Sequence, residues 1–342
     1  MSHMEPKEIR NINYKKSHTF DNPNFYIRLN DPEILDQKTE EEYKRILKAL
    51  GKYGLSAYIS YKKASQAESA HCAIKNCLNA AFDKNNDDSI ISKLASRYNL
   101  PNDVETEIDF INYGSTQMVY LANMANGDTK QEATILINQP NVNTQTIENE
   151  YINLQRLHDI DPRFVVEPLA YFSDKTHSLY ASEYIEKARC IFFNDQDWGV
   201  YDPVPKYHFE PFTEAVSSEV CSAMIAILIN YYDEKSGLGI AHTQLCGNDF
   251  ILSQNCDIND PNSILDNIKL IAARETIKIP LTDYIRLIKS EFMFGVSHRL
   301  KPGDGKISYA INHGSETPIN RTSLENGIGL GLKLRSDRDL LN

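Results

Sequence analysis

The hydrophobic pattern divides the chain into a helical stretch, a strand-rich stretch and a second helical stretch. The first thirty or so residues are polar, rich in Asn and Tyr, and without clear periodicity. Apolar residues then recur at helical spacing, and a long helix is predicted from about Ser56 to Phe82. Asp88 or Ser89 can cap a further helix that stops before Pro101. This part of the sequence therefore predicts a small helical module behind a flexible arm.

After Pro101 the apolar positions follow the period of strands. The pattern predicts strands at 107–113, 118–123, 133–137, 164–172 and 178–185, with a helix between the third and the fourth. An apolar helix is predicted from Thr213 to Tyr232, and an amphipathic helix over Leu281–Met293. The rest of the C-terminal part is weakly patterned. This order predicts an α+β protein in which a small antiparallel-sheet lobe precedes a helical lobe.

Composition and charge exclude several classes of partner. The chain has 342 residues, and 36 basic against 47 acidic residues give a net charge of −11. This acidic balance argues against nucleic acid or an anionic membrane surface as the main partner. The most apolar run, Val220–Ile229, is about ten residues long, whereas a membrane-spanning helix needs roughly 20. The sequence therefore predicts no membrane span.

The cysteines favour a reducing compartment. They form no Cys-x-x-Cys pair and have no zinc-ligand spacing, which makes reduced thiols the simplest interpretation. Together with the lack of a visible secretory signal, this predicts a cytoplasmic protein. Met1–Met4 resembles a cloning remnant. The six cysteines are Cys72, Cys77, Cys190, Cys221, Cys246 and Cys256.

The segment Leu238–Leu252 carries the most informative motif. It follows the apolar helix, contains Gly-Ile-Ala-His ending at His242, and leads through Asn248 into an apolar strand. In this order the segment resembles the catalytic loop of the protein-kinase superfamily, and the likeness extends in ordered pieces over about residues 108–273. Gln244 takes the place of the family's catalytic Asp, and an amide cannot act as a base near neutral pH.

The resemblance implies a bilobal kinase-like fold with an N-terminal helical extension. Too few residues remain after Arg274 for a full helical lobe, so the C-lobe is expected to be reduced. The predicted domains are a flexible arm or tag at 1–30, a helical module at 31–103, a kinase-like N-lobe at 104–186 and a kinase-like C-lobe at 187–342.

A kinase-like fold also implies a nucleotide site for ATP. Gly114 and Ser115 resemble part of the Gly-rich loop that covers the phosphates. The strand Ala133–Ile137 is similar to the one that carries the phosphate-binding lysine, yet it contains no Lys or Arg. Lys130 lies just outside that strand and could reach inward only in a different register. The expected phosphate cation is therefore missing.

Three further residues complete the candidate cofactor-binding set. Glu150 fits the helix glutamate that pairs with the kinase lysine; without that lysine we expect Glu150 to be a solvated helix charge. Glu183 and Ile185 lie in the segment similar to the hinge, whose backbone binds adenine in the family. Backbone recognition tolerates side-chain change, so this part of a pocket can persist.

Two carboxylates are candidate ligands for Mg²⁺ or Mn²⁺. Asp249 falls where the family has a metal-binding Asn, and a carboxylate is a good ligand for a hard cation. A shift of one residue would instead put Asn248 at this position. Ala272 replaces the Asp of the Asp-Phe-Gly motif, and Asp266 could substitute for it only if the hairpin is short. The alternative is that Asp266 and Asn267 form an ordinary turn. The candidate catalytic residues are accordingly limited to Gln244 and Asp249.

These departures lead to a primary hypothesis and two alternatives. The primary hypothesis is a pseudokinase that binds or regulates a protein partner. The first alternative is an active atypical kinase, or another ATP-dependent transferase such as an adenylylating enzyme. It would hold metal with Asp249 and Asp266 and direct Lys130, or a lysine beyond residue 275, toward the phosphates. The second is an unrelated α+β binding protein. The Asn-, Ile- and Lys-rich composition also resembles bacterial effectors that enter the host cytosol.

Overall fold

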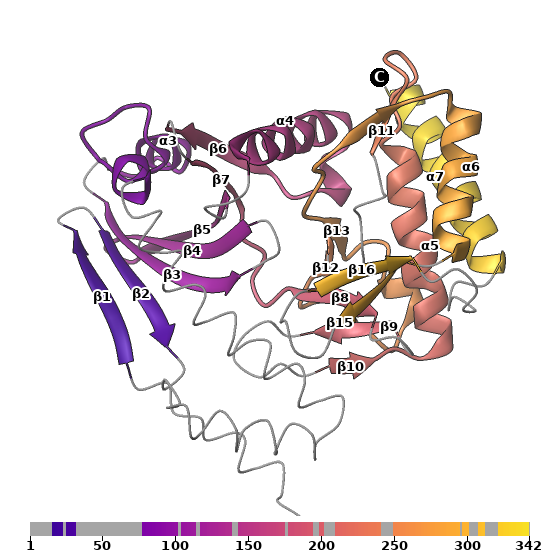
Figure 1. Ribbon diagram of the computed structural model, residues 1–342, viewed down its shortest axis with the longest axis horizontal. Coiled ribbons are helices and arrows are strands. Elements are labelled where there is room, and N and C mark those ends of the chain that lie inside the picture. The colour runs from indigo at the N-terminus through magenta and orange to yellow at the C-terminus, as the bar shows by residue number, and fades with distance from the viewer. Residues whose placement is uncertain are drawn as a thin grey trace, which may run out of the picture. The chain divides into compact units, whose positions relative to one another are not determined.

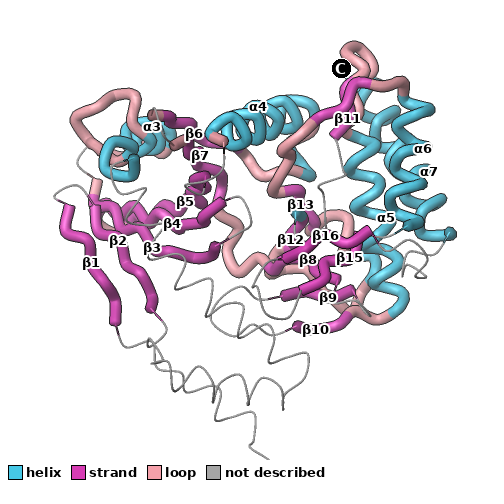
Figure 2. The backbone as a smooth tube through the Cα atoms, viewed as in Figure 1, coloured by secondary structure: helices cyan, strands magenta, loops and turns pink. Residues whose placement is uncertain are grey.

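The structure is a computed structural model of the chain, shown in Figures 1 and 2. It is a mixed α and β protein, and most of its paired strands run antiparallel. Contacts divide the chain into two compact units: the first comprises 1–147, 169–184 and 204–207, and the second comprises 148–168, 185–203 and 208–342. The structure describes residues 16–22, 25–31, 77–101, 104–113, 117–138, 143–174, 177–193, 198–201, 209–240, 249–294, 296–300, 307–311 and 321–341.

The first unit is built on a seven-stranded sheet with the order β1-β2-β3-β4-β5-β7-β6. Strands β3, β4 and β5 form an antiparallel meander, and β7 pairs with the other edge of β5. Strands β3 to β7 correspond to the five predicted from the sequence, in the same order. The fourth was predicted to begin at Phe164, which instead ends a 3₁₀ turn, and β6 begins at Pro168. Their bounds are Lys16–Asn22 (β1), Phe25–Asp31 (β2), Glu105–Tyr113 (β3), Gln117–Asn126 (β4), Thr129–Asn138 (β5), Pro168–Ser173 (β6) and Ser178–Glu183 (β7).

Strands β1 and β2 lie in the stretch for which the sequence predicted an arm without regular structure. They pair as an antiparallel hairpin, and β2 then pairs in parallel with β3. Polar residues interrupt both strands, which read KSHTFDN and FYIRLND, so neither has a clean alternation of apolar positions. The hairpin was therefore not predicted.

One hydrophobic core joins the sheet to the helical segment that precedes it. Helix α3 (Ile90–Arg97) begins where predicted, because the Ser89 hydroxyl accepts a hydrogen bond from the Ser92 N–H at 3.2 Å. A helical turn at residues 77–81 packs into the same core. The largely buried members include Cys77, Leu78, Phe82, Ile90, Leu94, Met118, Tyr120, Ala133, Ile135, Ile137, Leu179 and Ala181. The described helical segment and the sheet are thus parts of one compact unit.

The second unit is organised around helix α5 (Glu214–Asn230). The Thr213 side chain accepts a hydrogen bond from the Val216 N–H at 3.3 Å, which caps the helix at its predicted start. Every residue from Val220 to Asn230 is buried, as expected of a core helix. None of the helices that the structure describes has both the length and the apolarity to cross a bilayer. The other helices are α4 (Thr144–Ile160), α6 (Leu281–Phe294) and α7 (Arg321–Leu341).

The second unit also contains sheets, so the prediction that it is mostly helical was incomplete. The hairpin β12–β13 follows the predicted motif, whereas β8, β9 and β10, which pair in the same sheet, were not predicted. Two short pairs, β11–β14 and β15–β16, stand apart from that sheet. The bounds are Arg189–Phe193 (β8), Trp198–Tyr201 (β9), Phe209–Pro211 (β10), Leu238–Ile240 (β11), Phe250–Leu252 (β12), Ile268–Leu270 (β13), Thr276–Lys278 (β14), Val296–Leu300 (β15) and Ile307–Ile311 (β16).

Helix α7 packs closely against α5 through two glycines. The two helices run side by side in Figure 1. A Cβ atom on Gly327 would lie 2.6 Å from the Ser222 carbonyl oxygen, and one on Gly331 would lie 2.7 Å from the Ala226 carbonyl oxygen. Such distances leave no room for a methyl group, so only glycine permits this approach. Gly329, by contrast, has no atom within 4 Å of its Cβ position.

Candidate functional site

The structure describes some of the predicted site residues and not others. Gly114, Ser115 and Gln244 lie outside the described residues, as does His242. The predictions for the Gly-rich loop and for the replaced catalytic base therefore stay predictions. The candidates that the structure places are Glu150, Glu183, Ile185, Asp249 and Asp266.

Asp249 forms a buried ion pair with Arg274. Asp249 directly precedes β12, and Arg274 follows β13, so the two strands of the hairpin bring the side chains together. The Arg274 Nη1 atom lies 2.9 Å from the Asp249 Oδ1 atom, and the two side chains are only 17% and 3% exposed. The Asp249 carbonyl also accepts a hydrogen bond from the Ile271 N–H at 2.8 Å, which extends the strand pairing to this position. The carboxylate predicted to bind metal thus has a guanidinium beside it.

Helix α4 fixes the segment that carries Arg274. The Asn153 side chain donates a hydrogen bond to the Ala273 carbonyl at 2.8 Å. This bond joins α4 to the residue next to Arg274, just past Ala272, where the kinase family has its Asp-Phe-Gly motif. The position of Arg274 therefore depends on three elements: β12, β13 and α4.

Glu150 lies one turn before Asn153 on α4 and is fully buried. The expectation that it is a solvated helix charge was wrong. Glu150 therefore lies in the interior of the molecule, where a carboxylate is costly unless it is paired or hydrogen-bonded. The sequence prediction failed here because exposure was inferred from the lack of a lysine in the predicted strand 133–137.

Lys130 does not supply the missing cation. It lies near the start of β5, its side chain is 62% exposed, and its Nζ atom is 2.5 Å from the Glu132 Oε1 atom on the same strand. The buried positions of β5 are apolar at Ala133, Ile135 and Ile137, and the buried residue at its end, Asn138, is polar but uncharged. The structure therefore gives β5 an apolar inner face, as its sequence indicated.

Asp266 lies far from Asp249 along the β12–β13 hairpin. It is exposed in the turn, beside Asn267, whose carbonyl accepts a hydrogen bond from the Ser253 N–H. Asp249 and Ser253 are separated by four residues of extended chain, which is roughly 13 Å. One Mg²⁺ ion needs its oxygen ligands at about 2.1 Å, so these two carboxylates do not meet on one ion. Asp266 instead forms part of an ordinary turn, the alternative considered above.

Glu183 and Ile185 lie at the end of β7 and just beyond it, and both are half-buried. Glu183 pairs with Ala133 of β5, so its backbone is engaged in the sheet. Ile185 follows the strand, and its carbonyl accepts a hydrogen bond from the Ala188 N–H at 3.2 Å in a tight turn. Whether either backbone also binds adenine stays a prediction.

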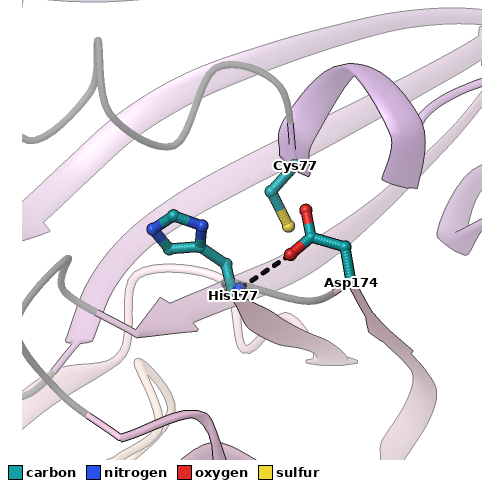
Figure 3. A group of neighbouring side chains, drawn as sticks. All are labelled: Cys77, Asp174 and His177. Carbon is teal, nitrogen blue, oxygen red and sulfur yellow. Dashed lines mark hydrogen bonds between the residues drawn. The ribbon is translucent and has the colours of Figure 1, made fainter.

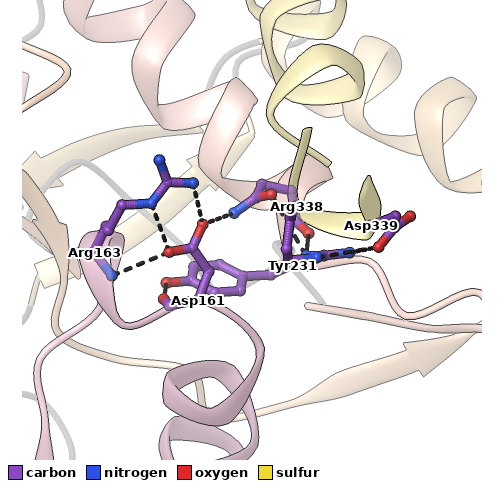
Figure 4. Close-up of polar contacts among 6 residues, drawn as sticks. Asp161, Arg163, Tyr231, Arg338 and Asp339 are labelled. Atoms are coloured by element: carbon purple, nitrogen blue, oxygen red, sulfur yellow. Dashed lines mark hydrogen bonds and ion pairs between the residues drawn. The ribbon is translucent and has the colours of Figure 1, made fainter. Parts of the chain in front are cut away.

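A polar cluster around Asp161 holds the second unit together (Figure 4). The buried Asp161 carboxylate accepts hydrogen bonds from Arg163 at 2.8 and 2.9 Å and from the Asn230 side chain at 2.9 Å. Tyr231 donates its hydroxyl to the Asp161 carbonyl, and Arg338 donates to the Asn230 carbonyl at 2.6 Å. Burial alone would raise the pKa of Asp161, but these bonds outweigh it and hold that pKa below its ordinary value.

A second cluster, which sequence reasoning missed, joins Cys77, Asp174 and His177 (Figure 3). Asp174 and His177 flank the turn between β6 and β7, whereas Cys77 comes from the helical segment far upstream. One potential ligand atom from each residue lies within 4.8 Å of the other two. The spacing Asp-x-x-His between two predicted strands was the available signal, but nothing in the sequence connects it to Cys77.

The comparisons with known proteins leave the family of the chain open. No protein-family model matches the sequence, and no curated protein is similar to it. Among solved structures, the chain is similar to the BubR1 kinase domain, with 16% sequence identity and a TM-score of 0.35, over 52% of this chain and 48% of that one. The likeness thus spans about half of each protein, and at this score it carries no argument about mechanism.

Proposed function

We propose that this chain is a kinase-like protein that does not transfer phosphate and acts by binding a protein partner. The ordered motifs from Gly114 to Ala273 and the order of strands around α4 support the kinase-like part. The ion pair between Asp249 and Arg274 carries the non-catalytic part. The Arg274 guanidinium lies beside the carboxylate that the sequence likens to a kinase metal ligand.

The ion pair argues against metal binding on electrostatic grounds. Phosphoryl transfer depends on metal ions and cations that neutralise the charge of the phosphates. Asp249 is 3% exposed, and in such a site a guanidinium and a divalent cation beside one carboxylate would repel each other strongly. Arg274 has a pKa too high to lose its proton, so it cannot become neutral to admit the metal. The carboxylate is therefore satisfied by the protein itself.

The positions of Asp266 and Lys130 count against the active-kinase alternative. Asp266 sits at the far end of the hairpin from Asp249, and Lys130 is exposed beside Glu132 on the polar side of β5. General-base help alone is worth about 10²–10⁴-fold, and Gln244 cannot provide it. The same deficits apply to an adenylylating enzyme, because that reaction also needs a metal-bound triphosphate.

Transfer assays with labelled ATP test the proposal. The chain is incubated with Mg²⁺ or Mn²⁺ and with ATP labelled at the α- or the γ-phosphate, together with protein and lipid acceptors. We expect no label on any acceptor above the level given by Asp249→Asn. Label that appears with the unaltered chain and is lost in Asp249→Asn would overturn the proposal, and the labelled position would tell kinase from adenylylating activity.

The binding part of the proposal has a separate readout. The chain and its Asp249→Asn variant are expressed in cells at equal abundance, and the phenotype that each produces is compared. If the chain acts by binding, we expect the two phenotypes to be the same. An effect that disappears with Asp249→Asn at equal abundance contradicts a role that does not need catalysis.

A further inference from the structure

Cys77, Asp174 and His177 meet inside the first unit, and none of the three is among the candidate site residues predicted from the sequence. Asp174 and His177 are held by two bonds across their turn: the His177 N–H donates to the Asp174 Oδ1 atom at 2.8 Å, and the Asp174 N–H donates to the His177 carbonyl at 2.9 Å. In Figure 3 the Cys77 sulfur points toward the Asp174 carboxylate, and the His177 ring lies beside them. Cys77 is 1% and His177 8% exposed, so packing fixes both side chains.

The three donors have the chemistry of a zinc site. A thiolate, an imidazole and a carboxylate together suit Zn²⁺ better than Mg²⁺ or Ca²⁺, which prefer oxygen ligands alone. Zinc–ligand distances of about 2.0–2.3 Å place tetrahedral donors about 3.3–3.5 Å apart. The donors here lie within 4.8 Å of one another, so a movement of roughly 1 Å would complete the geometry. Among the residues that the structure describes, this is the group of three His, Cys, Asp or Glu side chains whose potential ligand atoms all lie within 4.8 Å of one another.

The geometry, not the protonation of the free cluster, carries that role. Burial, with Asp174 as a second cause, raises the pKa of the Cys77 thiol well above its ordinary value, so without metal the thiol stays protonated and its S–H donates a hydrogen bond to the Asp174 carboxylate. Zinc must displace this proton, which lowers the affinity of the site. Burial also lowers the pKa of His177, which leaves the ring neutral and able to coordinate. When zinc binds, the thiol proton leaves to solvent and the metal takes its place between sulfur and carboxylate.

The arrangement also has a structural consequence. Cys77 lies in the helical turn at 77–81 that packs into the core of the sheet, while Asp174 and His177 lie between β6 and β7. We propose that Cys77, Asp174 and His177 bind one Zn²⁺ ion, with water as the fourth ligand, and that this ion fastens the helical segment to the edge of the seven-stranded sheet. This inference does not depend on the proposed kinase-like function.

Metal binding is measured on the full chain after removal of metal with a chelator. We expect one equivalent of Zn²⁺ per chain by titration, and at least a tenfold weaker affinity in both Cys77→Ala and His177→Asn. The matched controls Cys190→Ser and His158→Asn change the same residue types in the second unit and should bind as the unaltered chain does. Equal affinity in the site and control variants, or no stoichiometric binding, overturns the proposal.

A spectroscopic readout covers the case in which a site variant does not fold. Co²⁺ replaces Zn²⁺ in such sites, and a bound thiolate gives a charge-transfer absorption band that other ligands do not give. We expect this band in the unaltered chain loaded with Co²⁺, and its loss on adding Zn²⁺. Absence of the band in the unaltered chain rejects Cys77 as a ligand without recourse to any variant.

Discussion

At the scale of single residues, Asp161 shows how one carboxylate can connect distant segments. It precedes the 3₁₀ turn Pro162–Phe164, yet it also accepts a hydrogen bond from Asn230 at the end of α5. Its partner Arg163 is 58% exposed, so the ion pair between them is worth little by itself. The buried bond from Asn230 and the carbonyl contact with Tyr231 therefore supply most of the connection.

The lowered pKa of Asp161 predicts a pH-dependent contribution to stability. Because the folded-state pKa lies below the ordinary value, the contribution is present at neutral pH and is lost as the pH falls through the folded pKa. We expect Asp161→Asn to lower the free energy of unfolding by about 1.5–3 kcal/mol at pH 7. The difference from the unaltered chain should shrink as the pH approaches 3, in denaturant titrations at several pH values.

A matched control separates this effect from general acid denaturation. Asp337 is exposed on α7, and Asp337→Asn should track the unaltered chain at every pH. A stability difference for Asp161→Asn that stays constant between pH 7 and pH 3 would contradict the account of its pKa.

At single positions, the sequence predicted residue types better than their surroundings. It indicated that the segment 133–137 of β5 carries no Lys or Arg, and its placing of Asp249 at a metal-ligand position stays a prediction. It could not predict that Arg274 pairs with Asp249, since that contact depends on the exact pairing of β12 with β13. The burial of Glu150 was missed for a similar reason, because a helix pattern gives the face of a residue but not what covers it.

At the scale of elements, the glycines of α7 have opposite roles. Gly327 and Gly331 face α5 with no space for a side chain, whereas Gly329 faces away. Since glycine costs about 1 kcal/mol in a helix interior relative to alanine, the two contact positions are retained at the expense of helix propensity. The close approach that they allow compensates for that loss.

Three alanine substitutions test this reading of α7. We expect Gly327→Ala and Gly331→Ala each to destabilise the protein by about 1–3 kcal/mol, the range for overpacking a well-packed contact. Gly329→Ala should instead stabilise it by about 0.5–1 kcal/mol through helix propensity. Thermal unfolding of the three variants decides the matter, and equal shifts in the same direction would show that the glycines do not differ in role.

The same glycines explain why α7 was not predicted. Three glycines within five positions are typical of a turn or loop, so the sequence was taken as weakly patterned. Helices with an ordinary apolar pattern, such as α3 and α5, were predicted close to their observed starts: α3 with Asp88 or Ser89 as its cap, of which the structure has Ser89, and α5 from Thr213. Element prediction thus succeeded where local signals decide the structure and failed where a neighbouring helix decides it.

At the scale of the whole molecule, the order of elements was predicted better than their grouping. The strands from β3 to β7 and the helix between them follow the predicted order. The sequence did not predict that β1 and β2 extend the first sheet, or that β8, β9 and β10 pair beside β12. Pairing between distant strands depends on the fold as a whole, and short strands carry little periodic signal of their own.

Binding of Mn²⁺·ATP tests most directly whether Arg274, rather than a metal ion, satisfies the Asp249 carboxylate. Free Mn²⁺ is measured by electron paramagnetic resonance while the chain and its Asp249→Asn variant are titrated with Mn²⁺ at saturating ATP. Comparison of the two isotherms cancels binding at any other site, including Cys77, Asp174 and His177. The account predicts identical isotherms; one Mn²⁺·ATP fewer in Asp249→Asn than in the unaltered chain would contradict it.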